Sequence, residues 1–291
     1  MIYYDKFKKS FDNEATLRNL SPRTRESYWW HIKDYYNFLG KDPRETGVDE
    51  LRDYFLSMLS DGKHKPGSVK MGYYALKFLF TRIYHKEWAK EYLPTPKIAK
   101  TLPLVLSKEE VLDVLGVIPN FKHRSIIMFI YSTGTRISEC ANIKLTDIDS
   151  KRMQVNIREG KGLKQRYVPL SPLLLTTLRR FYNEYKPKHY LFEGAGGKAT
   201  HLSTSAIREI CNKARYHTRH IKKHYTPHTF RHCFATHLLE QGVNLLVIQR
   251  LMGHAGLSNT LKYLHVQQLS IDKVINPLDN LKGVEGLCKK K

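Results

Sequence analysis

The sequence predicts a mainly α-helical protein with a small antiparallel β region, arranged as two domains. Three observations predict this fold class. Apolar residues recur at helical spacing over most of the 291-residue chain. The prolines Pro94, Pro96 and Pro103 interrupt the helical pattern and separate a shorter N-terminal part from a longer C-terminal part. In the C-terminal part, two short segments flank a glycine-containing turn, as the strands of a β-hairpin do.

The N-terminal part is predicted to form four helices joined by short turns. A first helix is expected near Tyr3–Arg18. The second begins at Ser21, a residue type that caps helices, has Pro22 in its first position and ends at Gly40. Two more helices are predicted in VDELRDYFLSML and in SVKMGYYALKFLFTRIYHKEW, whose basic residues form a rim beside an apolar stripe. We therefore expect a small helical domain over residues 1–91.

The stretch YLPTPKIAKTLPLVLS is predicted to be an extended linker over residues 92–106, because proline blocks helix formation and favours extended backbone. Ser107 and Glu110 then match the capping-box pattern that opens a helix. We place the second domain at residues 107–275 and a C-terminal tail at residues 276–291.

The second domain combines helices with the β-hairpin. An apolar helix covers Ile126–Tyr131 and ends at Gly134. The strand segments MQVNIRE and RYVPL flank the turn GKGLKQ, and the first of them alternates apolar and polar residues. Further helices are expected near Leu173–Tyr185, Ser203–Arg215, Pro227–Gln241 and Leu245–Met252.

Charge is the unusual feature of the composition. The chain holds 49 lysines and arginines against 27 acidic residues, a formal net charge of +22. Such an excess attracts polyanions, and nucleic acid is the expected partner because each neutralised phosphate releases counterions. Basic residues outnumber acidic ones in both domains, so both could contact a polyanion. A merely soluble basic surface is the alternative.

An anionic membrane is the rival partner. However, no apolar run approaches the ~20 residues that a membrane span requires, and the N-terminal MIYYDKFKKS lacks the apolar core of a signal peptide. The four cysteines are scattered without a C-x-x-C pair, which favours reduced thiols over a disulfide framework or a cysteine zinc site. A cytoplasmic protein without membrane association is therefore expected.

Two segments offer cations for an anionic ligand. Arg136 in STGTRISEC follows the end of an apolar helix, where its guanidinium could be held rigidly and aimed at one phosphate. The alternative is an ordinary ion pair with Glu139. Lys161 lies between two glycines at the tip of the hairpin and could be lowered into a groove. The alternative for Lys161 is a solvated hairpin tip.

The segment TPHTFRHCFATHLL supplies a histidine and an arginine from one helix. His228 and Arg231 are three positions apart, so they project from one helix face. The pairs His228/His232 and Cys233/His237 also allow a metal-site interpretation. Against it, no carboxylate completes an H-E-x-x-H motif, and no second cluster has ligand spacing.

The segment LMGHAGLSNTLKYLHV adds His254 at a helix end and Tyr263 beyond a turn. Two arginines, a lysine, two histidines and a tyrosine are together the set that phosphoryl transfer without a metal needs. Arginines neutralise the non-bridging oxygens of the pentacoordinate phosphate, and a lysine or histidine protonates the departing oxygen. Tyrosine, with an ordinary pKa near 10, attacks only beside cations and a base. The sequence offers no Walker loop or carboxylate cluster for a metal-based route.

Four motifs follow one another along the second domain: TGTRISE, GKG with R-x-V-P-L, HTFRH-x-FATHLL and LMGHAGLSNTLKY. This ordered set resembles the motifs of the tyrosine recombinases, also called the phage-integrase family, and most closely those of the Xer type. The resemblance covers nearly the whole chain and implies an N-terminal core-binding (SAM-like) domain and a C-terminal catalytic domain. It implies six site residues, all of the expected type: Arg136 as the first catalytic arginine, Lys161 as the general acid, His228 and Arg231 as the H-x-x-R pair, His254 as the second histidine and Tyr263 as the nucleophile.

By this resemblance the protein is a site-specific DNA recombinase that acts through a 3′-phosphotyrosyl intermediate and a free 5′-hydroxyl, without metal, ATP or another cofactor. The implied partners are double-stranded DNA with inverted-repeat sites and, on that DNA, a tetramer of this chain or of this chain with a paralogue. A cytoplasmic, nucleoid-associated location follows. Family members exchange C-terminal segments between protomers. Here the segment after the tyrosine carries an apolar set that could dock on a neighbour or pack on its own domain: Leu269, Ile271, Val274, Ile275 and Leu278.

Three alternatives share part of this evidence. A non-catalytic DNA-binding protein would share the charge but would not need all six residues. A type IB topoisomerase would share the chemistry, although the compact N-terminal domain and the exchangeable tail favour recombination. A metal-dependent nuclease rests only on the histidine-rich helix. The flank NTLKYLHV departs from the family's commoner TTxxYTHV, and the segment before HTFRH lacks the insertion that integron-type enzymes use on folded single strands, which favours duplex DNA.

Overall fold

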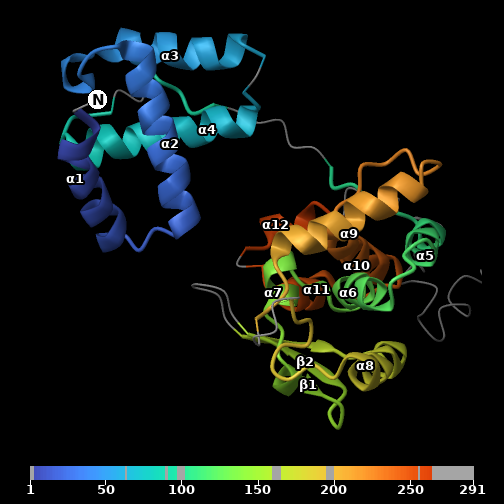
Figure 1. The fold of residues 1–291 in the computed structure, drawn as a ribbon. Helices are drawn as coiled ribbons and strands as arrows, with labels where there is room; N and C mark the ends of the chain where they lie inside the picture. Colours follow the sequence, from blue (N-terminus) through green and yellow to red (C-terminus); the bar gives the residue numbers. More distant parts are fainter. Residues whose placement is uncertain are drawn as a thin grey trace, which may run out of the picture. The chain divides into compact units, whose positions relative to one another are not determined.

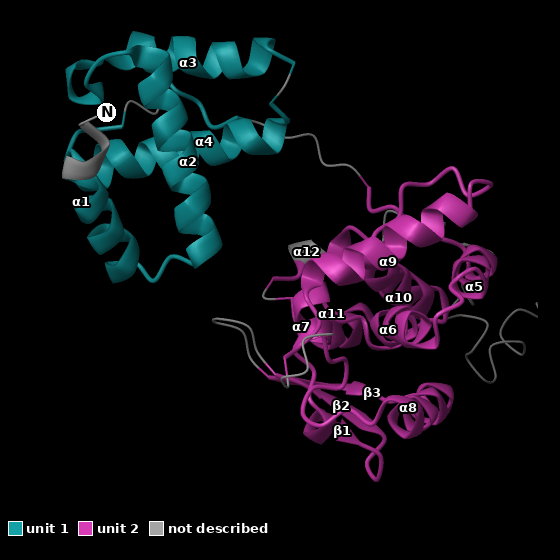
Figure 2. Ribbon diagram, viewed as in Figure 1, with its two compact units in different colours: residues 1–100 teal, residues 101–291 magenta. Residues whose placement is uncertain are grey.

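The computed structural model describes residues 3–62, 64–88, 91–96, 102–158, 165–194, 200–254 and 256–263. The chain divides into two compact units, residues 1–100 and residues 101–291 (Figure 2). The described residues are mainly helical and contain one small antiparallel sheet, so the fold class predicted from the sequence is confirmed. None of the helices in these ranges has the length and hydropathy that crossing a membrane requires.

Unit 1 is a helical domain. Its elements are α1 (Tyr3–Leu17), α2 (Pro22–Leu39), the 3-10 turn η1 (Pro43–Glu45), α3 (Val48–Ser60), α4 (Pro66–Phe78) and the π-helical turn η2 (Leu79–Ile83). The Ser21 hydroxyl accepts a hydrogen bond from the Thr24 N–H and caps α2, which ends at Gly40 in the left-handed conformation (φ 65°). Both ends of α2 are therefore as predicted.

The last helix of unit 1 is shorter than the sequence predicts. The predicted segment runs to Trp88, but regular α-helix stops at Phe78 and the chain continues as the π-helical turn. Backbone bonds from Tyr84 N–H to Leu79 O and from Lys86 N–H to Phe80 O close this wider turn. Trp88 still packs on the core, because its Nε1–H donates to the Tyr73 hydroxyl at 2.8 Å.

An aromatic core holds unit 1 together. Helix α2 packs against α4, with α1 and α3 on either side. Aromatic pairs such as Tyr35–Tyr54 and Phe11–Phe78 meet at an angle, a favoured arrangement for ring contacts. The most deeply buried side chains come from all four helices: Phe11, Ile32, Tyr35, Tyr54, Met58, Val69, Tyr73 and Leu76.

Unit 2 contains the sheet and the remaining helices. In chain order they are α5 (Lys108–Gly116), α6 (Phe121–Thr133), α7 (Ile137–Ala141), η3 (Leu145–Asp147), β1 (Ile148–Asp149), β2 (Gln154–Ile157), β3 (Arg166–Pro169), α8 (Pro172–Tyr185), α9 (Thr204–His217), α10 (Pro227–Glu240), α11 (Leu245–Met252) and α12 (Ser258–Leu261). The sheet and α8 lie on one side of the unit and α9 on the other, with α6, α10 and α11 between them (Figure 1).

The sheet has the order β1-β2-β3, and both pairs are antiparallel. Val155 of β2 lies opposite Val168 of β3 and Ile148 of β1. Strands β2 and β3 are the predicted hairpin strands. Strand β1 is a two-residue addition that the sequence does not predict, since two residues are too few to show an alternating pattern.

Helix α10 is the centre of unit 2. It packs against α6, α9 and α11, so it is buried on most of its faces. Its apolar side chains, among them Phe230 and Cys233, join the main core of the unit. Four polar residues of α10 are buried: Thr229, Arg231, Thr236 and His237. Because buried polar groups need partners, the side chains of Thr229, Arg231 and His237 form hydrogen bonds inside the protein.

Candidate active site

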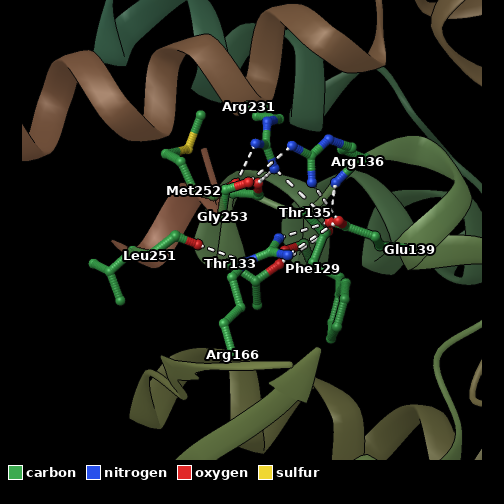
Figure 3. Close-up of polar contacts among 11 residues, drawn as sticks. Phe129, Thr133, Thr135, Arg136, Glu139, Arg166, Arg231, Leu251, Met252 and Gly253 are labelled. Carbon is green, nitrogen blue, oxygen red and sulfur yellow. Dashed lines mark hydrogen bonds and ion pairs between the residues drawn. The ribbon is translucent and has the colours of Figure 1, made fainter. Parts of the chain in front are cut away.

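Three arginines from separate segments meet around one carboxylate. Arg136 is the N-cap of α7, Arg166 begins β3, and Arg231 lies in the second turn of α10. Figure 3 shows their guanidinium groups converging on Glu139 of α7, below the C-terminal end of α11. Side chains far apart in the sequence therefore form one polar cluster.

Glu139 is the central acceptor of this cluster. Its oxygens accept from Arg136 Nη1 at 2.6 Å and from Arg166 Nη2 and Nη1 at 2.6 and 3.0 Å, and Arg231 Nη1 lies 3.8 Å away. Burial would raise the pKa of this carboxyl, but the hydrogen bonds and charge of Arg166, together with the hydrogen bonds from Arg136, lower it to about 2. Glu139 is therefore ionised and holds the arginines in a fixed arrangement.

Arg231 is the most deeply buried of the three arginines, with 5% of its side chain exposed. Its Nη1 donates to the carbonyl of Gly134 and its Nη2 to the carbonyl of Met252. Burial and the neighbouring charge of Arg136 lower its pKa to about 10, so it still carries its charge at neutral pH. These bonds fix the guanidinium between the end of α6 and the end of α11.

Arg136 is more open, with 28% of its side chain exposed. Besides its bond to Glu139, its Nη2 donates to the carbonyl of Gly253 at 3.1 Å. The turn that aims it is fixed by Gly134, which ends α6 in the left-handed conformation (φ 61°) against the ring of Phe234. Arg136 can therefore offer free N–H groups to an anion while Glu139 and Gly253 hold its position.

His254 and Tyr263 lie beside this cluster, on the chain that follows α11. His254 Nδ1 is 2.9 Å from the Thr260 hydroxyl. Its ring lies nearly parallel to the Tyr263 ring, with centroids 6.4 Å apart. Burial, followed by the charges of Arg231 and Lys262, lowers the pKa of His254 to about 3, so it is a neutral hydrogen-bonding group at pH 7.

Tyr263 is completely buried, with 0% of its surface exposed, and packs in an apolar cluster with Ile248 and Met252. Its hydroxyl lies 2.9 Å from Nδ1 of His232 on α10. Burial raises the pKa of this phenol to about 12, although the charges of Arg231 and Arg136 act in the opposite direction. The tyrosine is therefore a protonated phenol held beside two arginines and an imidazole.

His228 and Lys262 border the site. His228, in the first turn of α10, is exposed, and loss of hydration followed by the charge of Arg231 lowers its pKa. The pKa of Lys262 is lowered by the same two causes. Both basic residues therefore lie in the positive field of Arg231, where a phosphate would relieve the repulsion between them.

The structure brings together four of the six residues named from the sequence. Arg136, Arg231, His254 and Tyr263 surround one site, and His228 lies at its border. Lys161 falls outside the described residues, as does the apolar set after Tyr263. The catalytic roles of these residues are predictions from the sequence.

Three residues of the site have no catalytic role in the sequence interpretation: Glu139, Arg166 and His232. The sequence offers Glu139 only as an ion-pair partner of Arg136, and His232 only as one half of a metal-ligand pair with His228. Arg166 opens the second hairpin strand opposite Ile157, and its guanidinium donates to Glu139 of α7 and to the Leu251 carbonyl of α11. His232 is one helical turn after His228, so the same periodicity that joined His228 to Arg231 could have placed it on the site face.

The metal-site interpretation finds no support in the part of the chain that the structure describes, where no group of three His, Cys, Asp or Glu side chains could hold an ion. Cys233 and His237 instead serve packing. His237 contacts the Leu106 carbonyl at 3.0 Å and the Tyr131 hydroxyl at 2.8 Å, and the Leu106 N–H donates to Cys233 Sγ. These bonds attach the segment before α5 to α10.

Two family models match the chain. The model described as the phage integrase family matches residues 105–269, and the model of the phage integrase N-terminal SAM-like domain matches residues 7–90. The chain is 36% identical to tyrosine recombinase XerA of Pyrococcus furiosus, over 93% of this chain and 95% of the relative. It is 32% identical to a tyrosine recombinase of Thermosipho africanus, over 88% of this chain and 93% of the relative.

Solved structures share the fold. A λ integrase dimer bound to a COC′ core site has a TM-score of 0.74 at 17% identity, over 93% of this chain and 98% of that chain. The XerH site-specific recombinase in a post-cleavage complex with a palindromic difH substrate has a TM-score of 0.72 at 20% identity, over 94% and 84% of the two chains. At these identities the likeness concerns the fold alone.

Proposed function

The chain belongs to the phage integrase family of tyrosine recombinases, and from this premise we propose how it acts on DNA. Its function is site-specific DNA recombination, and its enzymatic class is that of the tyrosine recombinases. The alternatives of a DNA-binding protein without catalysis and of a relaxing topoisomerase are not favoured. The named relatives are recombinases, and the similarity to this chain covers nearly their whole length.

The observation that carries the proposed chemistry is a tyrosine hydroxyl next to a cluster of fixed cations. Arg231 and Arg136 are held by Glu139 and by backbone carbonyls, so they would need little rearrangement to receive the non-bridging oxygens of a phosphodiester. Prearranged charge of this kind stabilises a pentacoordinate transition state more than the ground state. His254 and His228 would add hydrogen bonds to the same phosphate.

In the proposed reaction, the Tyr263 oxygen attacks the phosphorus and forms a 3′-phosphotyrosyl bond while the bond to the 5′-oxygen breaks. The departing 5′-oxygen takes a proton from Lys161, the general acid that the family pattern assigns. The 5′-hydroxyl of the partner strand then attacks the phosphotyrosine and releases Tyr263. The energy of the phosphodiester is kept in the covalent intermediate, so no nucleotide hydrolysis or metal is required.

We propose double-stranded DNA with inverted-repeat sites as the substrate and a tetramer on DNA as the active assembly, formed by this chain alone or with a paralogue. The relatives in DNA complexes and the net charge of +22 support DNA binding. The proposed domains are a core-binding domain over residues 1–91, a linker, a catalytic domain over 107–275 and a tail, in a cytoplasmic protein that works at the nucleoid.

The test is covalent trapping. The full-length protein is incubated in EDTA with fragmented chromosomal DNA from the organism that encodes it, and a denaturant then stops the reaction. Sequencing the DNA that stays attached to protein should give one or a few sites with inverted repeats, and a nicked oligonucleotide of such a site should give a covalent complex on a denaturing gel. Absence of any protein–DNA adduct would contradict the proposed function.

A further inference from the structure

The hydroxyl of Tyr263 has a specific partner that the six assigned residues do not include. His232 Nδ1 lies 2.9 Å from the phenolic oxygen, and the two rings are tilted by 52° with centroids 5.7 Å apart. His232 is half-buried on α10, one residue after Arg231, so its backbone is fixed by the central helix of unit 2. Such a contact at the reacting atom needs a chemical explanation.

We propose that His232 is the proton acceptor of the tyrosine nucleophile, with Nδ1 taking the phenolic hydrogen as the Tyr263 oxygen attacks phosphorus. The inference rests on the proposed function, since it assigns a base to that reaction. The tautomer protonated at Nε2 leaves the Nδ1 lone pair free to accept.

The other basic groups of the site are less well placed for this step. The His254 ring lies parallel to the tyrosine ring, and its Nδ1 contacts the Thr260 hydroxyl. Lys262 has its Nζ over the tyrosine ring, 5.4 Å from the centroid, instead of at the hydroxyl. His228 is exposed at the start of α10. Within the described residues, the hydrogen bond of the Tyr263 hydroxyl is made with His232.

Burial and the neighbouring charges keep His232 unprotonated. Burial, followed by the charge of Lys262 and the proximity of His228 and Arg231, lowers its pKa to about 4, so the imidazole is neutral at pH 7 and can accept. A phosphodiester held by the arginines would bring negative charge to the same place. That charge offsets the cations and raises the basicity of His232 when the phenol must lose its proton.

The proton and electron pairs balance over the reaction. In cleavage, the O–H pair of Tyr263 becomes the O–P bond and its proton goes to His232 Nδ1. The P–O5′ pair stays on the leaving oxygen, which is protonated by the general acid. In strand joining, the 5′-hydroxyl gives its proton to the now deprotonated general acid and its oxygen forms the new bond to phosphorus. The O–P pair stays on the departing oxygen of Tyr263, to which His232 returns its proton. His232 should therefore act in both half-reactions.

The test compares His232→Asn with wild type on two nicked DNA substrates at the trapped site, one with the natural 5′-oxygen and one with a bridging 5′-sulfur at the scissile phosphate. A thiolate leaves without protonation, so the sulfur substrate removes the need for a general acid but not for a base at the tyrosine. We expect His232→Asn to be about 10²-fold slower on both substrates. Lys161→Ala should be slow only on the oxygen substrate.

His237→Asn is the matched control. His237 lies on the same helix and is buried, but it contacts Leu106 and Tyr131 instead of Tyr263. We expect His237→Asn to cleave the oxygen and the sulfur substrate with the same ratio of rates as wild type. Both rates should be closer to wild type than those of His232→Asn. Because the rates are compared with a wild type that does form the adduct, failure of this proposal is distinguishable from failure of the proposed function.

A second variant covers the case in which asparagine disturbs folding. His232→Ala leaves space beside the tyrosine, and added imidazole should restore cleavage in proportion to its concentration if proton acceptance is the missing role. Wild-type rates for His232→Asn on both substrates would overturn the proposal. A defect that disappears on the sulfur substrate would also overturn it, since it would place His232 at the leaving group.

Discussion

Arg231 is deeply buried, and we propose that it binds the phosphate of the DNA. Its guanidinium uses separate nitrogens for the carbonyls of Gly134 and Met252, a division that the single ammonium of lysine cannot reproduce. We expect Arg231→Lys to form the covalent DNA complex about 10²-fold more slowly or worse, with DNA binding retained. Single-turnover rates at saturating DNA measure this, and an unchanged rate would remove Arg231 from the transition-state site.

Glu139 predicts a pH dependence of stability. Its pKa is lowered from 4.5 to about 2 in the folded protein, so the carboxylate stabilises the fold above pH 4.5, and this contribution is lost as the pH falls toward 2. We expect Glu139→Gln to lower the free energy of unfolding by about 3 kcal/mol at pH 7, because it leaves buried guanidinium charge without its counterion.

Urea unfolding of wild type and Glu139→Gln measures this difference. The gap between the two proteins should be full at pH 7 and become smaller below pH 4.5. Glu209→Gln, an exposed residue on α9, serves as the control and should change stability by less than about 0.5 kcal/mol. A gap that stays constant as the pH falls would contradict the assigned role of the Glu139 charge.

The sequence predicts the residues that the proposed chemistry needs better than it predicts the contacts that fix the positions of those residues. Arg136, Arg231 and Tyr263 stand in motifs whose order is readable. The contacts of Arg166 and His232 depend on a strand pairing and on the position of the chain after α11, which local spacing does not specify. Support of this kind comes from tertiary structure, so it could be seen only in the fold.

At the scale of elements, the turn from α6 to α7 positions Arg136. Gly134 has φ 61°, and a Cβ added there would lie 2.3 Å from the Phe234 ring of α10. Gly40 has nearly the same φ, 65°, but open space around it. A comparison of substitutions at the two glycines therefore distinguishes the cost of backbone strain from the cost of steric conflict.

We expect Gly40→Ala to cost about 1 kcal/mol of unfolding free energy, the penalty for a left-handed residue with a side chain. Gly134→Ala should cost clearly more, because Phe234 must also move, and it should slow covalent complex formation by displacing Arg136. Thermal or urea unfolding and the trapping assay measure the two effects. Equal costs for the two substitutions would show that the contact with Phe234 has no influence.

The helix ends follow from local chemistry, and the exceptions are instructive. Ser21, Ser107 and Asn120 cap their helices through the side-chain bonds that their residue types favour. Helix α4 departs from its apolar stripe, because the π-helical turn keeps Phe80 buried while it ends the regular helix. A stripe of apolar residues shows burial, but it does not specify which hydrogen-bond pattern produces that burial.

At the scale of the whole molecule, the charge of +22 predicts strong dependence of DNA affinity on salt. We expect the association constant for duplex DNA to fall about 10³-fold or more between about 50 and 200 mM salt, as for proteins that neutralise many phosphates. Fluorescence anisotropy of a labelled duplex measures it. An affinity that does not change over this range would mean that the positive charge is not used on DNA.

Residue-level mapping of the trapped adduct tests the central claim most directly. The covalent complex formed on the nicked site is digested with protease and nuclease, and mass spectrometry identifies the residue that carries the nucleotide. The arrangement of Tyr263 beside Arg231 and Arg136 predicts phosphotyrosine at Tyr263, and no adduct from Tyr263→Phe although that variant still binds DNA. An adduct on any other residue, or one that survives in Tyr263→Phe, would contradict the account.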